Sequence, residues 1–121
     1  MKIAFPAFTE DPDNLIEARF GRAKYFVIYD TETEQFTSIP NQVDLLSPVG
    51  AGIQAAQKVI ESGAQVVITG HCGPKAFKVL SSVGIKVITG AEGIKIKEAL
   101  EKYKKGELQP TLKPDVEGHW G

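Results

Sequence analysis

The sequence contains a single cysteine among its 121 residues. One thiol cannot form an intramolecular disulfide, and it cannot supply the several thiolates of a structural zinc site. Neither a disulfide framework nor the apolar core of a signal peptide is present, so we expect the chain in a reducing cytoplasm. The sequence also lacks the roughly 18 consecutive apolar residues of a membrane-spanning helix, and no membrane association is expected.

An excess of charge of one sign is absent as well. Lys and Arg total 14 and Asp and Glu total 15, which gives a net charge of −1 at pH 7. Without a large basic field, the chain is not expected to bind nucleic acid. The hydrophobic fraction of 42% and the charged fraction of 24% are typical of a globular protein, and the length fits one domain. We expect a monomer or a weak homodimer.

Two kinds of pattern divide the chain. Runs rich in β-branched and aromatic residues predict strands over residues 2–5, 24–30, 35–39, 66–69 and 85–89, with Pro6 ending the first strand. Apolar residues at helical spacing predict helices over residues 50–63, 73–82 and 92–105. We therefore expect an α/β domain over residues 1–105 and an extended or flexible tail over residues 106–121.

A repeated motif indicates how the strands of the second half are arranged. Val67-Ile68-Thr69-Gly70 recurs as Val87-Ile88-Thr89-Gly90, each time as a strand followed by a turn and a helix. Consecutive strand–helix units favour parallel strands with helices on the faces of the sheet. The predicted fold is a three-layer α/β domain with a five-stranded mixed sheet of order 3-2-1-4-5, in which only strand 2 is antiparallel.

This topology predicts an anion-binding crevice at one edge of the sheet. Three helices would begin there, near Gly50, Gly73 and Gly93, and helix N-termini carry unpaired N–H groups and partial positive charge. Glycine at or beside each helix start allows a ligand to approach the backbone closely. For the same reason Gly52, Gly70 and Gly90 are also candidate ligand-binding residues. Arg22 is the best candidate for an anion contact, and Arg19, Lys24 and Lys75 add positive charge nearby.

The turn between residues 69 and 74 places His71 and Cys72, the only cysteine, beside a predicted helix start. Helix N-termini lower thiol pKa values, and thiolate and imidazole are common metal ligands. Cys72 and His71 are thus candidate metal ligands. The simpler alternatives are that Cys72 is a small side chain packed in the interior and that His71 is a polar surface residue. Adjacent residues in a tight turn rarely face each other, which argues against a Cys–His hydrolase, and a thiol enzyme using Cys72 is a minor alternative.

In these segments the chain resembles the dinitrogenase iron–molybdenum cofactor biosynthesis family, that is, NifX-like and NifB C-terminal-like domains. The similarity spans roughly residues 1–105 and rests on an ordered set of motifs: Lys2-Ile3-Ala4-Phe5, Phe20-Gly21-Arg22-Ala23-Lys24-Tyr25-Phe26, Gly50-Ala51-Gly52, Val66-Val67-Ile68-Thr69-Gly70, Gly73-Pro74-Lys75-Ala76 and Gly84-Ile85-Lys86-Val87. It implies a ribonuclease H-like fold without nuclease activity. Members often have histidine before the Phe-Gly pair, where this chain has Arg19, which directs attention to His71 and Cys72.

The resemblance also implies a function. Such families carry or deliver iron–sulfur or molybdenum–sulfur clusters, which are anionic and would suit the predicted crevice. We therefore expect a small non-enzymatic protein that binds such a cluster or its precursor, with cluster-assembly or acceptor proteins as partners. The alternative is a sensing or protein-interaction module that binds a phosphate-bearing small molecule in the same crevice.

Overall fold

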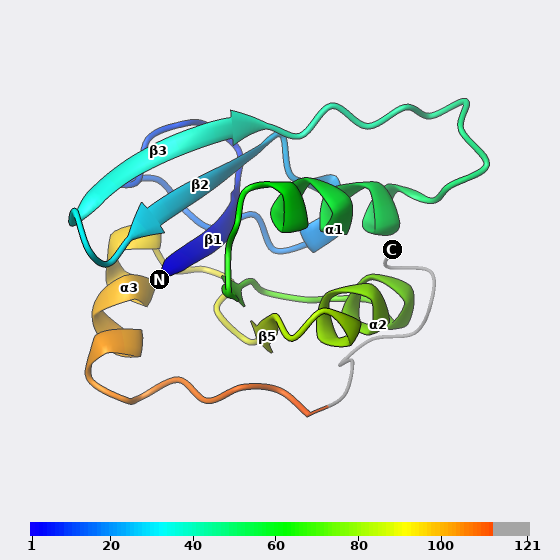
Figure 1. Ribbon diagram of the computed structural model, residues 1–121. Coiled ribbons are helices and arrows are strands. Elements are labelled where there is room, and N and C mark those ends of the chain that lie inside the picture. Colours follow the sequence, from blue (N-terminus) through cyan, green and yellow to red (C-terminus); the bar gives the residue numbers. More distant parts are fainter. Residues whose placement is uncertain (113–121) are drawn as a thin grey trace.

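The computed structural model describes residues 1–112, which form one mixed sheet flanked by helices (Figure 1). The predicted tail is therefore described only over residues 106–112, and its other residues lie outside the described part. The strands are β1 (Lys2–Ala7), β2 (Tyr25–Asp30), β3 (Gln35–Pro40), β4 (Val66–Ile68) and β5 (Lys86–Ile88). The helices are the short 3₁₀ helix η1 (Phe20–Arg22), α1 (Ala51–Glu61), α2 (Pro74–Ser82) and α3 (Ile96–Lys104).

The sheet has the strand order β3-β2-β1-β4-β5. β2 is antiparallel to both β1 and β3, whereas β1 and β5 are each parallel to β4. These observations confirm the predicted α/β class, the strand order and the reversal of strand 2 alone. The ribonuclease H-like classification stays a prediction.

Pro6 does not end the first strand, so that prediction was wrong. β1 continues to Ala7, and Pro6 pairs with Phe26 of β2. The Pro6 carbonyl oxygen accepts a hydrogen bond of 2.9 Å from the Glu17 N–H, on the side of β1 that faces away from β2. The N–H and C=O of a strand residue point to the same side, so the N–H that proline lacks would also face away from β2. The ladder between β1 and β2 therefore loses no bond.

Alternating strand residues build an apolar core on each face of the sheet. α1 and α2 pack on one face, over Ala4, Phe26, Ile28, Val67 and Val87. α3 packs on the other face, over Ile3, Phe5, Val27, Val66 and Ile68. Figure 1 shows α1 and α2 side by side, both beginning toward the right of the view. This packing places both of their N-termini at the carboxyl edge of the parallel strands.

Within residues 1–112, no helix is both long enough and apolar enough to cross a lipid bilayer.

Candidate functional site

Two helices begin at glycines on the carboxyl edge of the parallel strands. Gly50 precedes α1 and Gly73 precedes α2, and both have extended backbone angles (φ −65°, ψ 159° and φ −70°, ψ 165°). No side chain among the described residues caps either helix, and neither first turn contains an acidic residue. Gly52 lies buried in the first turn of α1. The partial positive charge of both N-termini is therefore not offset by a carboxylate of its own turn.

The third helix does not begin near Gly93, and this part of the prediction was wrong. α3 begins at Ile96, and Gly93 lies in the turn before it with a φ of +82°. The Ile96 N–H donates to the Asn14 carbonyl oxygen at 3.0 Å, and the Lys97 N–H donates to the Pro12 carbonyl oxygen at 3.1 Å. Because nearby backbone already uses these donors, the start of α3 is not open to an anion. The predicted crevice therefore contains two helix starts, not three.

Gly70 holds the loop between β4 and α2 against the segment that precedes η1. Its carbonyl oxygen accepts a 2.8 Å bond from the Gly90 N–H. The His71 N–H donates to the Ala18 carbonyl oxygen at 2.6 Å, and the Phe20 N–H donates to the His71 carbonyl oxygen at 3.1 Å. A Cβ atom on Gly70 would lie 2.6 Å from the Ala18 carbonyl oxygen, so only glycine fits without a backbone shift. The structure thus brings Gly70, His71 and Gly90 together at this edge.

The Cys72 side chain lies in the apolar core below α1 and α2 and is only 1% exposed. His71, its neighbour in the chain, is half-buried. A thiol covered to this extent contacts a ligand only if the surrounding side chains move. The burial fits a packing role for Cys72, and ligation by Cys72 or His71 stays a prediction.

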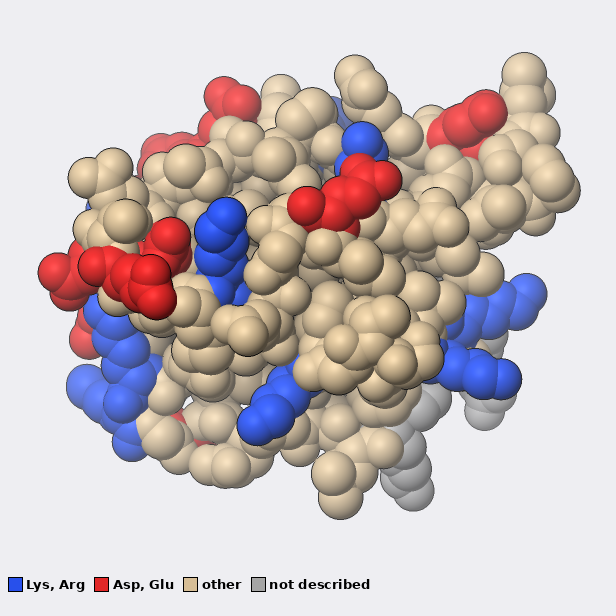
Figure 2. Space-filling model, in the orientation of Figure 1, with Lys and Arg blue, Asp and Glu red and all other residues tan. Residues whose placement is uncertain are grey.

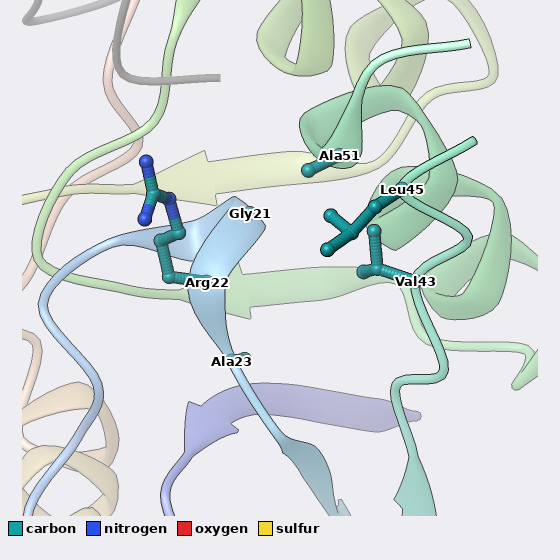
Figure 3. A pocket seen from close by; sticks show the side chains of 6 residues that line it. All are labelled: Gly21, Arg22, Ala23, Val43, Leu45 and Ala51. Carbon is teal, nitrogen blue, oxygen red and sulfur yellow. The ribbon is translucent and has the colours of Figure 1, made fainter. Parts of the chain in front are cut away.

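A pocket of ≈370 Å³ lies between η1, the start of α1 and the loop after β3 (Figure 3). We call it the η1 pocket, and it is lined by Gly21, Arg22, Ala23, Val43, Leu45 and Ala51. In Figure 3 the side chains of Val43, Leu45 and Ala51 gather on one side, and the Arg22 side chain extends on the other side of the η1 ribbon. Arg22, the predicted anion contact, is exposed and is the one charged residue in this lining.

Charge is distributed unevenly over the surface. In Figure 2 acidic side chains gather on the left, over the turn between β2 and β3, with basic side chains directly below them. Further basic side chains project on the right, beside α2, and acidic atoms lie above these at the upper right. Arg19, Arg22, Lys24 and Lys75, the four cations predicted near the crevice, are all exposed. Arg22 lines the η1 pocket and Lys75 lies in the first turn of α2, so each helix start has a cation near it, while the exposed Asp44 lies between the lining residues Val43 and Leu45.

The described side chains at this edge do not form a conventional metal site. Among residues 1–112, no three His, Cys, Asp or Glu side chains are grouped so that they could hold a metal ion. The described part of the edge is therefore better suited to an anion than to a bare metal cation.

Among the hollows lined by described residues, two lie away from these helix starts. One of ≈400 Å³ lies at the turn between β2 and β3, beside Lys2 and Asp30. The other, of ≈250 Å³, lies between β5, α3 and residues 106–110. Neither lining includes the start of α1 or α2, so neither matches the predicted anion chemistry.

The loop after β3 contributes to the site, although none of its residues was among the predicted site residues. Residues 41–48 fall between the strand predicted over 35–39 and the helix predicted over 50–63, and Val43 and Leu45 of this segment line the η1 pocket. Leu45 is 88% exposed and Leu46 is 95% exposed. Two adjacent leucines between Asp44 and Ser47 are unusual for a polar connection. This pair could have indicated, from the sequence, that the turn contributes apolar surface to a binding site.

A protein-family model and a curated relative each match most of the chain. A family model described as dinitrogenase iron–molybdenum cofactor matches residues 1–106. An uncharacterised protein of Methanocaldococcus jannaschii is 28% identical over an alignment of 111 residues that covers 90% of this chain and 90% of that protein.

Solved structures share the fold over nearly the full length. The apo form of the orange protein from Desulfovibrio gigas is 37% identical, with a TM-score of 0.89 over 95% of this chain and 96% of its own. A Thermotoga protein provisionally assigned as a NifB protein is 28% identical, with a TM-score of 0.78 over 95% of this chain and 98% of its own. The similarity therefore includes the elements that form the η1 pocket.

Proposed function

The chain belongs to the dinitrogenase iron–molybdenum cofactor family, and on that premise we propose that it binds an anionic iron–sulfur or molybdenum–sulfur cluster, or a precursor, as cargo in metallocluster assembly. The family match and the similarity to the orange protein support a role in metallocluster biosynthesis or binding. The same findings favour a binding protein over an enzyme. Partners in this proposal are the proteins that assemble the cluster or accept it.

One observation supports the proposal: the η1 pocket is lined both by Arg22 and by Ala51, the first residue of the uncapped helix α1. In our proposal the Arg22 guanidinium attracts the anion, and the backbone N–H groups near Gly50 and Gly52 face it. The adjoining edge supplies the second helix start, which follows Gly73, and the exposed Gly90 lies at the same edge. Gly70 is buried against Ala18, so its part in the proposal is to hold this edge in place. Gly93 has no part in it, because α3 begins at Ile96.

Protein ligands to the metal are secondary in this proposal. A cluster whose metals are already bound by sulfide needs charge complementarity more than it needs thiolates, which agrees with the lack of a metal-binding group among residues 1–112. His71 is the more accessible of the two candidate ligands, because Cys72 is 1% exposed. Burial of the Cys72 thiol also weighs against a thiol enzyme, whose nucleophile must reach its substrate.

Anaerobic reconstitution tests the proposal. The purified chain is incubated with iron and sulfide, with and without molybdate, then desalted and examined by visible absorption and metal analysis. We expect a coloured species that stays with the protein, at no more than about one cluster per chain. The absence of any protein-bound chromophore under all of these conditions would contradict the proposal.

A second candidate function rests on the same helix starts. Uncapped helix N-termini also bind phosphate, so a phosphate-bearing small molecule is the alternative ligand for this edge. A thermal-shift screen separates the two functions. Stabilisation by nucleotides or inorganic phosphate, with none by thiometallates, would favour a sensing module over a cluster-binding protein.

A further inference from the structure

One glutamine side chain holds both ends of the turn that carries Leu45. The Gln54 Oε1 atom accepts a hydrogen bond from the Asp44 N–H at 2.8 Å. Its Nε2 atom donates to the Asp44 carbonyl oxygen at 2.9 Å and to the Val49 carbonyl oxygen at 2.7 Å. Gln54 belongs to α1, and its own N–H donates to the Gly50 carbonyl oxygen at 3.1 Å. The turn over residues 44–49 is therefore fastened to the first turns of α1.

The remaining hydrogen bonds of this turn are internal. The Leu46 N–H donates to Asp44 Oδ1 at 2.9 Å, and the Ser47 N–H donates to the Asp44 carbonyl oxygen at 3.3 Å. The Val49 N–H donates to Ser47 Oγ at 3.0 Å. Such bonds define the shape of the turn but do not fix its position against the helix. Besides the chain connection through Gly50, the three hydrogen bonds made by Gln54 join the turn to α1.

The position of this turn determines one wall of the η1 pocket. Leu45 is 88% exposed, so cargo that contacts it removes apolar surface from water, which is favourable. Of the six lining residues only Arg22 is charged, and its guanidinium is more weakly hydrated than an ammonium group. A strongly hydrated oxyanion would lose water against Val43 and Leu45 without gaining donors there. A sulfide-covered anion, which is larger and more polarisable, loses less hydration.

From these contacts we infer that Gln54 is the positioning residue of the η1 pocket. By holding the turn against α1, it places Leu45 as an apolar wall, and this wall makes the pocket select sulfide-covered anions over oxyanions. The identity of the cargo rests on the proposed function, whereas the placement of the turn by Gln54 stands without it.

The placement is tested by hydrogen exchange on the full chain. Gln54→Met keeps the length of the side chain and removes all three hydrogen bonds, and Gln57→Met, at an exposed position of the same helix, is the matched control. We expect the Asp44 N–H to exchange about tenfold faster or more in Gln54→Met and at the wild-type rate in Gln57→Met. Unchanged exchange of Asp44 in Gln54→Met would overturn the inference. Should Gln54→Met fail to fold, Gln54→Ala removes the same three hydrogen bonds, and exchange at Asp44 is read in the same way.

The selectivity is tested with two probes of the same metal, tetrathiomolybdate and molybdate. We expect the wild type and Gln57→Met to bind tetrathiomolybdate at least about tenfold more tightly than molybdate, and Gln54→Met to lose most of this preference. A preference that persists in Gln54→Met, in spite of fast exchange at Asp44, would overturn the inference and leave the proposed function intact. Binding of neither anion by the wild type would overturn both the selectivity and the proposed function.

Discussion

The His71 N–H donates a 2.6 Å hydrogen bond to the Ala18 carbonyl oxygen, which joins the segment before η1 to the loop before α2. The Phe20 N–H returns a bond to the His71 carbonyl oxygen, and Arg19 pairs with His71 as a parallel bridge. Phe20 is the first residue of η1, the helix that carries Arg22. The position of the Arg22 backbone is therefore set by contacts between segments more than 50 residues apart, as Ala18 and His71 show.

Gly70 precedes His71 and packs against Ala18, and we predict that its substitution destabilises the folded protein. A methyl group in Gly70→Ala would lie 2.6 Å from the Ala18 carbonyl oxygen and 2.9 Å from the Ala18 Cα atom, and both are backbone atoms. The backbone must shift to accommodate it, so we expect a loss of about 1–3 kcal/mol in the free energy of unfolding. Urea denaturation measures this loss.

Gly50→Ala is the control for Gly70→Ala. No described atom lies within 4 Å of a Cβ atom built on Gly50, and its φ of −65° suits any residue. We expect a change below about 1 kcal/mol, because alanine is only a poorer N-cap than glycine. An equal loss in both variants would show that the contact between Gly70 and Ala18 is not what makes glycine necessary.

Arg22 is predicted to act through its charge. Arg22→Gln removes the one cation of the η1 pocket, and we expect it to weaken binding of tetrathiomolybdate about three- to tenfold and to reduce the dependence of affinity on salt. Lys58→Gln is the control, because it removes the same charge near the other end of α1. There Lys58 Nζ lies 3.9 Å from Glu61 Oε2. Titrations at two salt concentrations compare the variants. A similar loss in both would indicate a general effect of net charge.

The burial of Cys72 predicts that its thiol reacts slowly in the folded protein. In the folded protein we expect a disulfide reagent such as dithionitrobenzoate to react with Cys72 much more slowly than in urea, because the side chain is 1% exposed. The absorbance of the released thiolate measures both rates. Prompt reaction of the folded protein would show that Cys72 is accessible to ligands.

Substitution of the two candidate ligands separates ligation from electrostatic binding. If charge dominates, Cys72→Ala and His71→Ala keep the cluster occupancy of the wild type after anaerobic reconstitution. We expect Cys72→Ala to be less stable, because it leaves a small cavity in the core. Metal analysis of folded, desalted samples gives the occupancy. Loss of the cluster in either variant would identify that side chain as a ligand.

The sequence was sufficient for the features that depend on local patterns. The β-branched runs at β4 and β5 and the Gly73-Pro74 pair at the start of α2 were read correctly, because burial and helix initiation leave short-range signals. From these elements, and from the expectation that consecutive strand–helix units form parallel strands, the order of the strands was predicted correctly.

The features that the sequence did not reveal depend on contacts between distant segments. α3 begins at Ile96 and not near Gly93. At this start the N–H groups of Ile96 and Lys97 donate to the carbonyl oxygens of Asn14 and Pro12. The role of Gln54 was equally hidden, since a glutamine in a helix gives no indication that it binds a loop ten residues earlier in the sequence. Neither contact has a periodicity that a sequence pattern could show.

The central claim is that the η1 pocket holds an anionic metal–sulfur cargo, and an NMR titration with tetrathiomolybdate tests it most directly. On binding, we expect the largest changes in amide chemical shift at residues 21–23, 43–45 and 51–53, with none at Lys86 and Gln109, which line the hollow beside β5. The absence of saturable shift changes, or changes centred on Lys86 and Gln109 or on Lys2 and Asp30, would contradict the claim.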